Sequence, residues 1–315
     1  MRVLMLSASE VERLLDAEAL LGALGDAFEA LSAGEVVAPG RGEVTADGAG
    51  FLLTMPVYRP GSDITVKMVS VFHDNEAAGL PSHQALICLF DGATGTPVCI
   101  MDGAYITAMR TAGASALTIR ALAREDARTL AIIGAGTQGA AHLKLAPFAR
   151  DFREIRVASP RFAHAERLAA SDDRARAVPS IEEAVRGADV VCLCTSAAEP
   201  VVRADWLSPG AHVTSVGYRP PGGELDGAII ERGHLFVETR RAFAAPPVGC
   251  GELAGRDPAS GTEIGELLLG SRPGRTSGDE ITIYKAMGHA CEDMAAASLV
   301  YRRAQEQGAG DVVTL

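Results

Sequence analysis

The chain has 315 residues, 48% hydrophobic and 22% charged, which is the composition of a soluble globular protein long enough for two domains. Its formal net charge of −11 at pH 7 argues against nucleic acid or an anionic membrane as a partner, because both attract basic surfaces. The N-terminal apolar run is too short for a signal peptide, no window reaches the length of a membrane span, and the six cysteines show no zinc-binding spacing. We therefore expect a cytoplasmic protein with reduced thiols and no metal site.

The first part of the chain is expected to be helical. Apolar residues recur at helical spacing over Ser9–Leu31, which predicts one amphipathic helix. Ser7 and Glu10 have the spacing of a capping box at its start. The stretch Val36–Gly50 is rich in glycine and predicts a loop that contains Arg41. Taken in isolation, a lone arginine in a loop is most simply a solvated surface residue.

The next part of the chain is expected to be rich in β-structure. Glycine and proline turns separate four expected strands, Phe51–Met55, Ile64–Phe72, Gln84–Phe90 and Pro97–Met101. Lys67 lies in the middle of the second strand, on the same face as Thr65 and Val69. A lysine inside such an apolar strand either guards an exposed edge or is held in a site. From the strand alone, the edge is the simpler interpretation.

Tyr105–Ala123 has a helical composition and carries Arg110 between Thr107 and Thr111. Small neighbours let a ligand approach closely, and an arginine there can bind a carboxylate through two parallel hydrogen bonds. A surface salt bridge explains the same residue equally well. This helix alone leaves both interpretations open.

After Thr129 the pattern changes to alternating strands and helices, which predicts an α/β domain with a doubly wound parallel sheet of Rossmann type. The expected strands are Leu130–Ile133, Ile155–Ala158, Val190–Cys194, Val213–Val216 and Leu235–Val237. The expected helices are Thr137–Ala149, Ala163–Ala170, Ile181–Arg186 and Thr262–Leu269. Asp279–Gln307 is expected to form one long helix that returns to the first domain. We therefore predict an α+β domain over 1–122 plus 290–315 and a Rossmann domain over 123–289.

A glycine-rich turn follows the first strand of that domain. Gly134, Gly136 and Gly139 have the G-x-G-x-x-G spacing, and Thr137 and Gln138 lie inside it. The first glycine allows a tight turn, the second lets a pyrophosphate approach the backbone, and the third lets the helix pack against the strand. The helix N-terminus then offers amide groups to the phosphates. An ordinary strand-to-helix turn is the alternative, and the position between a strand and a helix favours a dinucleotide site.

The tip of the second strand bears on the choice of cofactor. In such folds an acidic residue there holds the ribose hydroxyls of NAD. This chain has Ser159 and Arg161 instead, and these two can hold the 2′-phosphate of NADP. We therefore expect NADP(H), with NAD possible and with an Arg161 that merely begins a solvated helix as the alternative. Thr195 and Ser196 follow a strand and are expected to line the same crevice.

The sequence resembles the ornithine cyclodeaminase/mu-crystallin family over nearly its whole length. The segments that carry the resemblance include DNEAAGLPSHQ, ITAMRTAG, LAIIGAGTQGAAHLKL and GDEITIYKAMGHACEDMAAASLVY. The resemblance implies a homodimer, whose first domain, completed by the last helix, forms the subunit interface and much of the substrate pocket. It also implies that the middle of the chain binds NAD(P), with Thr111 and Val216 completing the expected cofactor contacts.

The resemblance further implies hydride transfer between nicotinamide and the Cα of a small amino or imino acid. Family residues that match Arg41, Lys67 and Arg110 surround the substrate carboxylate, and Met55 belongs to the pocket strand. This favours a site over the edge and surface interpretations given above. Lys67 and Arg110 are the expected catalytic residues, because fixed cations orient a carboxylate and a lysine can also supply a proton.

Two positions depart from the pattern of ornithine cyclodeaminases. Arg219 stands nearest to the place of their catalytic aspartate, and Leu53 stands where they carry a glutamate ahead of Met-Pro. An arginine near the side-chain ammonium of ornithine would be repulsive. We therefore expect a cyclic ketimine reductase or amino-acid dehydrogenase. An NAD-dependent ornithine cyclodeaminase that makes proline and ammonia, and a non-catalytic NADPH-dependent binding protein of mu-crystallin type, remain as alternatives.

Overall fold

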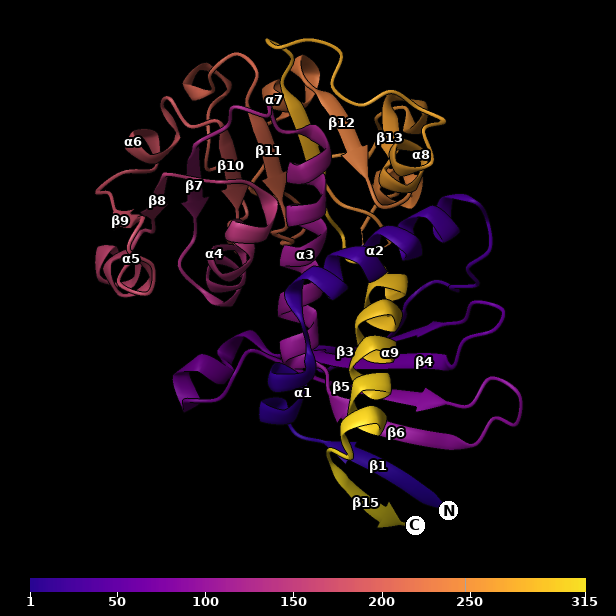
Figure 1. The fold of residues 1–315 in the computed structure, drawn as a ribbon. Helices are drawn as coiled ribbons and strands as arrows, with labels where there is room; N and C mark the ends of the chain where they lie inside the picture. The colour runs from indigo at the N-terminus through magenta and orange to yellow at the C-terminus, as the bar shows by residue number, and fades with distance from the viewer. Residues whose placement is uncertain (247) are drawn as a thin grey trace. The chain divides into compact units, whose positions relative to one another are not determined.

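The computed structural model describes residues 1–246 and 248–315. They form two compact units, Met1–Arg110 with His289–Leu315 as unit 1 and Thr111–Gly288 as unit 2. The division falls inside helix α3 (Ala104–Leu122). Figure 1 shows the ribbon of both units.

Unit 1 contains a seven-stranded mixed sheet in the order β15-β1-β6-β5-β4-β3-β2. Its strands are β1 (Arg2–Leu6), β2 (Gly42–Ala46), β3 (Gly50–Val57), β4 (Ile64–Val71), β5 (His83–Phe90), β6 (Pro97–Asp102) and β15 (Asp311–Thr314). The four strands expected from the sequence, β3 to β6, are confirmed. The loop expected over Val36–Gly50 is wrong in part, because it contains β2. Every residue of that edge strand is exposed, so no alternation of apolar residues marks it.

Three helices cover one face of this sheet, α1 (Ala8–Leu14), α2 (Ala17–Ser32) and α9 (Ala290–Gln307) (Figure 1). The last of them, α9, packs on β3, β4 and β5 and alongside α2. The single helix expected over Ser9–Leu31 is wrong, because the chain leaves the helix at Leu15 and Asp16 caps α2. Aspartate favours a cap over a helix interior. The capping box of Ser7 and Glu10 is confirmed.

Unit 2 contains an eight-stranded sheet in the order β13-β12-β14-β11-β10-β7-β8-β9, and the pairings that join them are parallel. Its strands are β7 (Thr129–Ile133), β8 (Glu154–Ala158), β9 (Ala175–Ala177), β10 (Val190–Leu193), β11 (His212–Ser215), β12 (His234–Val237), β13 (Gly261–Glu263) and β14 (Thr282–Lys285). Its further helices are α4 (Thr137–Ala149), α5 (Phe162–Ala169), α6 (Ile181–Val185), α7 (Gly227–Arg232) and α8 (Ile264–Leu268). The doubly wound Rossmann-type fold is confirmed. The strand order reverses between β7 and β10, where such sheets bind ligands.

The long helix expected over Asp279–Gln307 is wrong in its first part. The residues of β14 are all buried, and the strand pairs with both β11 and β12 in the interior of the sheet. A short apolar run does not distinguish a buried strand from a buried helix turn. The helix α9 begins only after the N-cap residue His289.

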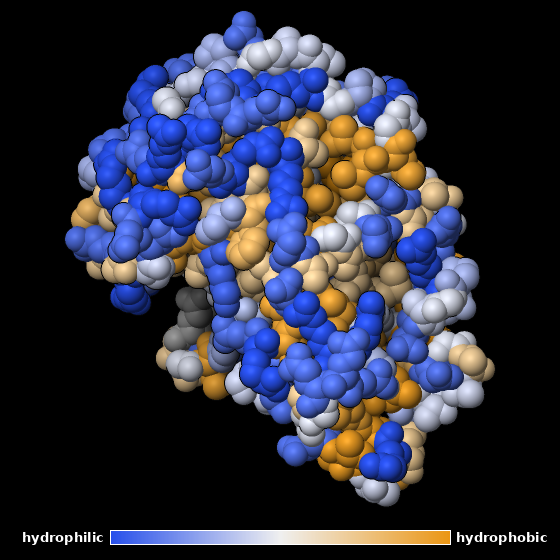
Figure 2. All heavy atoms as spheres, viewed as in Figure 1, coloured by the Kyte–Doolittle hydropathy of each residue, from blue (hydrophilic) through white to orange (hydrophobic). Residues whose placement is uncertain are grey.

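Short 3₁₀ helices complete the described chain, at His73–Ala78, Ala204–Trp206, Arg240–Phe243 and Pro258–Ser260. All six cysteines are free thiols. Within residues 1–246 and 248–315, we find no helix with the length and apolar character that crossing a bilayer requires. Figure 2 shows hydrophobic side chains gathered where Figure 1 places β1 and β15; exposed apolar residues of these strands include Met5, Val312 and Val313.

Candidate functional site

The glycine turn after β7 has a conformation and a packing that require glycine at two of its three positions. Gly134 has φ +107°, and a Cβ there would lie 2.4 Å from the carbonyl oxygen of Cys194. A Cβ on Gly139 would lie 2.0 Å from the carbonyl oxygen of Gly134. A Cβ on Gly136, by contrast, would meet no atom within 4 Å. The turn and the close helix packing are therefore as predicted, and space lies open beside the middle glycine.

The helix α4 begins at this turn without a side-chain cap. Its N-cap residue is Gly136, and no side chain accepts a hydrogen bond from its first amides. The side-chain Oε1 of Gln138, in the first turn, is buried without a hydrogen-bond partner among the described residues. Uncapped amides at a helix N-terminus bind anions. The open space beside Gly136 and these amides fit the pyrophosphate of a dinucleotide.

The tip of β8 carries the residues expected to choose the cofactor. Ser159 is half-buried immediately after the strand, and Arg161 is exposed as the N-cap residue of α5. The acid of this strand, Glu154, lies at its other end, bound to Arg156 and Arg176. The tip therefore carries a hydroxyl and a guanidinium and no carboxylate.

A buried carboxylate that the sequence analysis missed holds the ends of β10 and β11. Glu224 accepts hydrogen bonds from the amide of Thr195 at 2.7 Å and from its hydroxyl at 2.6 Å. It also accepts from Ser215 Oγ at 3.0 Å and from the amide of Gly217 at 2.6 Å. Thr195 is therefore held at the end of β10 by Glu224. Half-buried Val216 lies between two of the residues that Glu224 fixes.

A buried lysine joins this frame from β14. Lys285 Nζ donates to the carbonyl of Gly217 at 2.7 Å, to Ser215 Oγ at 3.1 Å and to Glu252 Oε1 at 2.9 Å. This lysine was not predicted as a site residue, because the sequence indicated a helix where β14 lies. Arg219, at the position of the missing aspartate, is exposed and donates to the carbonyl of Ser196 at 3.2 Å.

Unit 1 contains a buried cluster of four charged side chains. Lys67 Nζ lies 2.8 Å from Oδ1 and 2.7 Å from Oδ2 of Asp293. Arg110 Nε lies 3.1 Å from Asp293 Oδ1, and its NH1 atom lies 3.2 Å from Glu292 Oε2. Lys67 is 1% exposed and Asp293 is fully buried. The edge interpretation of Lys67 and the surface interpretation of Arg110 are therefore wrong.

Three elements of unit 1 position this cluster. The strand β4 carries Lys67 between β3 and β5, on the face that alternation turns toward the helices. The helix α3 supplies Arg110, and the first turn of α9 supplies Glu292 and Asp293. Neither acid was predicted as a site residue from the sequence. The signal available was their place inside a segment that carries the family resemblance. Their position in the first turn of α9, where acids are favoured, was hidden because the expected helix began at Asp279.

Burial and the neighbouring charges set the protonation of the cluster. Burial lowers the pKa of Lys67 to about 8, with Arg110 acting in the same direction and Asp293 and Glu292 opposing it. Burial raises the pKa of Asp293, but the nearby charges of Lys67 and Arg110 outweigh it, and the net pKa is lowered. The cluster thus places an ammonium that can lose its proton near neutral pH beside a carboxylate that stays ionised.

The other residues expected to bind the substrate, Met55 and Arg41, lie at the level of Lys67, on β3 and just before β2. Met55 is buried and pairs directly with Lys67 across β3 and β4. Arg41 is half-buried and precedes Gly42, which pairs with Thr54. The backbone of Arg41 therefore lies at the level of Lys67, two strands away. Thr111 follows Arg110 on α3 and is buried.

Two buried hydroxyl groups in unit 1 have no hydrogen-bond partner among the described residues. Thr65 Oγ1 lies on the same face of β4 as Lys67, and Thr107 Oγ1 lies one turn before Arg110 on α3. Neither atom has a hydrogen-bond partner within the described part of the chain. A buried hydroxyl without a partner costs about 1 to 3 kcal/mol, so a hydrogen bond from a polar ligand would stabilise either of these two groups.

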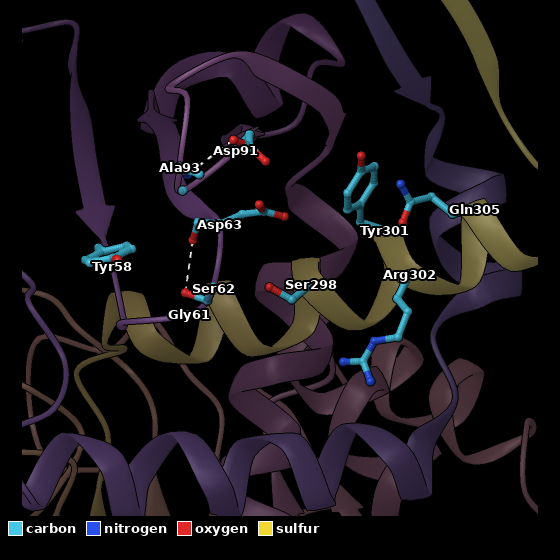
Figure 3. Close-up of a pocket in the computed structure, with 11 residues that line it drawn as sticks. Tyr58, Gly61, Ser62, Asp63, Asp91, Ala93, Ser298, Tyr301, Arg302 and Gln305 are labelled. Atoms are coloured by element: carbon cyan, nitrogen blue, oxygen red, sulfur yellow. Dashed lines mark hydrogen bonds between the residues drawn. The ribbon is translucent and has the colours of Figure 1, made fainter.

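A cavity of about 630 Å³ opens elsewhere in unit 1, between the β3–β4 and β5–β6 turns and the C-terminal half of α9. Figure 3 shows Asp63 and Asp91 on its turns and Tyr301 and Arg302 on α9. Burial and the charge of Asp91 raise the pKa of Asp63. None of the residues that line this cavity was singled out from the sequence.

The parallel sheet, its reversal of strand order at β7 and the glycine turn at that point define a Rossmann-type dinucleotide-binding protein. The chain belongs to the ornithine cyclodeaminase/mu-crystallin family, whose model matches residues 1–308. The buried cluster of Lys67 and Arg110 lies inside the matched range.

Relatives support this assignment in sequence and in structure. The ketimine reductase mu-crystallin of Mus musculus is 36% identical over 305 residues, covering 94% of this chain and 96% of that one. The Delta(1)-pyrroline-2-carboxylate reductase of Thermococcus litoralis, solved with NADH and L-proline, has a TM-score of 0.92 and 32% identity, covering 99% of this chain and 100% of that one. An archaeal alanine dehydrogenase dimer with bound NAD has a TM-score of 0.89 and 29% identity, covering 100% of each chain.

Proposed function

We propose that this chain is an NAD(P)-dependent oxidoreductase that transfers hydride between nicotinamide and the Cα of a small amino or imino acid. Its activity is that of a cyclic ketimine reductase or an amino-acid dehydrogenase. The observation that carries the proposal is the buried pair of cations, Lys67 and Arg110, fixed on one carboxylate in a family whose relatives are named as reductases and dehydrogenases of such acids.

The cofactor would be held by unit 2. The amides of Thr137 and Gln138 and the open face of Gly136 bind the pyrophosphate, and the crevice at the ends of β10 and β11 takes the nicotinamide end. Bound nicotinamide supplies or accepts the hydride. The frame of Glu224 and Lys285 keeps the crevice walls in place.

Two residues at the tip of β8 in unit 2 favour the binding of NADP(H) over NAD(H). The hydroxyl of Ser159 can donate a hydrogen bond to a 2′-phosphate, and the exposed guanidinium of Arg161 offers it a positive charge. An acid at this tip would repel that phosphate. Thr111, Ser196 and Val216 are further expected cofactor contacts, the last two at strand ends where ligands bind in such sheets.

The substrate carboxylate would be held by unit 1. Asp293 and Glu292 already fix the orientation of Arg110, so this side chain loses little conformational entropy when it binds a substrate carboxylate. Lys67 adds a second fixed cation and supplies a proton to the nitrogen of a C=N bond during reduction. Arg41 and Met55 complete the pocket. Because the groups are fixed in advance, positioning and electrostatics account for most of the rate gain.

We further propose that the chain forms a homodimer through the face of the unit 1 sheet opposite its helices. That face presents Leu52 and Leu86, 38% and 51% exposed. Half-buried Met68 pairs with Leu86, and half-buried Cys88 follows Leu86 on the same face of β5. Contiguous apolar surface of this kind marks an interface. Sedimentation velocity is expected to give a dimer of the 32.7 kDa chain and to give monomer for Leu86→Glu. A monomeric wild-type chain would contradict the proposal.

The activity is tested with the purified chain and a panel of five- and six-membered cyclic imino acids, keto acids with ammonia, and L-ornithine. We expect oxidation of NADPH, followed by absorbance at ~340 nm, with the cyclic imino acids, and a lower KM for NADPH than for NADH. Proline and ammonia formed from ornithine with NAD would instead identify a cyclodeaminase. Tight NADPH binding without turnover of any substrate would contradict an enzymatic role.

A further inference from the structure

The two cations of the proposed substrate site share one carboxylate that comes from the far end of the chain. Lys67 Nζ contacts both oxygens of Asp293, and Arg110 Nε contacts Oδ1 of the same group. The separation in sequence is 226 positions for the lysine and 183 for the arginine. The Asp293 carboxylate therefore connects the side chain of Lys67 on β4 with that of Arg110 on α3.

The neighbouring acid, Glu292, is engaged differently. Its Oε1 accepts from the backbone amide of His289, as the second half of a capping box that starts α9. Its Oε2 accepts from Arg110 NH1. The capping box fixes the first turn of α9, and Asp293 is the next residue on that turn. The helix start thus determines where the Asp293 carboxylate lies.

We propose that Asp293 is a positioning residue for the proposed reaction, because it holds the ammonium of Lys67 and the guanidinium of Arg110 side by side for one substrate carboxylate. This inference rests on the function proposed above. It assigns to α9 a part in the chemistry that the sequence did not indicate. It differs from a structural tether, which would stabilise the fold without setting the rate or the pH dependence of the reaction.

The surroundings of Lys67 make that difference measurable. On the neighbouring strands, Met55 of β3 and Ile87 of β5 pair directly with Lys67. Both side chains are uncharged. The charged groups that face it come from α3, as Arg110, and from α9, as Glu292 and Asp293. Burial and Arg110 disfavour the ammonium, so the two acids are what keep Lys67 protonated near neutral pH.

The direction of the pH effect follows from the role of Lys67. Imine reduction needs the protonated ammonium, so activity is present below the pKa of Lys67 and is lost as pH rises through it. In the wild type this pKa is about 8. Without the charge of Asp293, burial and Arg110 act with less opposition, and the pKa falls further. The alkaline loss of activity then begins at lower pH.

The test compares the pH profile of kcat/KM for cyclic imine reduction in the wild type, Asp293→Asn and Glu35→Gln. Glu35 forms an exposed ion pair with Arg59 and serves as the matched control, with an unchanged profile. We expect the alkaline limb of Asp293→Asn to move down by about one to three pH units. Because all variants use the same substrate, its own titration cancels in the comparison. A folded Asp293→Asn with the wild-type limb would overturn the proposal.

Asp293→Glu keeps the charge and so tests position even if the asparagine variant fails to fold. Its carboxylate lies one methylene further out, so we expect the limb to stay near the wild-type pH while kcat/KM falls by about 10²-fold. Wild-type kcat/KM in this variant would overturn the proposal.

Calorimetric titration of L-proline into the wild type, with cofactor present, separates this inference from the proposed function. If the wild type binds no proline and turns over neither the cyclic imino acids nor the keto acids with ammonia, the proposed function has failed. Wild-type binding and turnover together with an unmoved limb in Asp293→Asn would mean that only the role of Asp293 has failed.

Discussion

Replacing Lys67 by methionine is expected to lower kcat/KM for imine reduction by about 10²- to 10⁴-fold, which is the range for losing a positioned proton donor. Methionine keeps most of the length and the apolar contacts of the side chain in β4 but cannot be protonated. Stopped-flow and steady-state NADPH absorbance measure the effect. The exposed Lys144 on α4 offers a matched control, and Lys144→Met should keep wild-type kcat/KM.

The same substitution also leaves the Asp293 carboxylate buried with one cation fewer. Breaking a buried ion pair in this way costs about 3 to 5 kcal/mol of the free energy of unfolding, so loss of activity alone is ambiguous. The double variant Lys67→Met with Asp293→Asn removes both charges of the pair. We expect it to recover much of the lost stability in thermal denaturation while remaining inactive. Recovery of activity along with stability would show that Lys67 has no chemical role.

The parts of the fold that could be predicted are those with a short-range sequence pattern, such as the alternation of buried and exposed residues along one strand. Alternation placed β4 and set the face of Lys67 correctly, because that pattern depends on which side of the strand is buried. The strand-to-helix glycine turn was predicted from its local spacing, part of which reflects the close approach of Gly139 to the carbonyl of Gly134. The edge strand β2 has no buried face and therefore had no such pattern.

The parts that were missed depend on contacts between distant segments. Nothing in the neighbourhood of Lys67 indicates that its partner is Asp293, because the two meet only when α9 packs on β4. The same holds for Glu224 and for Lys285, whose partners gather at the ends of three strands. Charged residues buried in the core are costly unless paired, so the burial of Lys67 and Lys285 requires carboxylate partners that only the folded structure identifies.

Replacing Gly139 by alanine is expected to weaken cofactor binding and destabilise unit 2. The new Cβ would lie 2.0 Å from the carbonyl oxygen of Gly134, which is backbone in a turn with φ +107°. Neither atom belongs to a flexible side chain, so α4 must move away from β7. Overpacking of this kind costs about 1 to 3 kcal/mol or more. Thermal denaturation measures the stability, and titration of NADPH fluorescence measures the affinity, which should fall at least about tenfold because the helix N-terminus is displaced.

The middle glycine separates cofactor binding from folding. Gly136→Ala adds a Cβ that meets no protein atom within 4 Å on an extended backbone, so the free energy of unfolding should stay within about 0.5 kcal/mol of wild type. The same methyl group lies where the pyrophosphate approaches, so NADPH affinity should still fall. Gly22→Ala on α2, where a Cβ also meets no atom within 4 Å, controls for the substitution itself and should keep wild-type affinity. If Gly136→Ala bound NADPH as tightly as this control, the open space beside Gly136 would not be the phosphate site, even if Gly139→Ala behaved as expected.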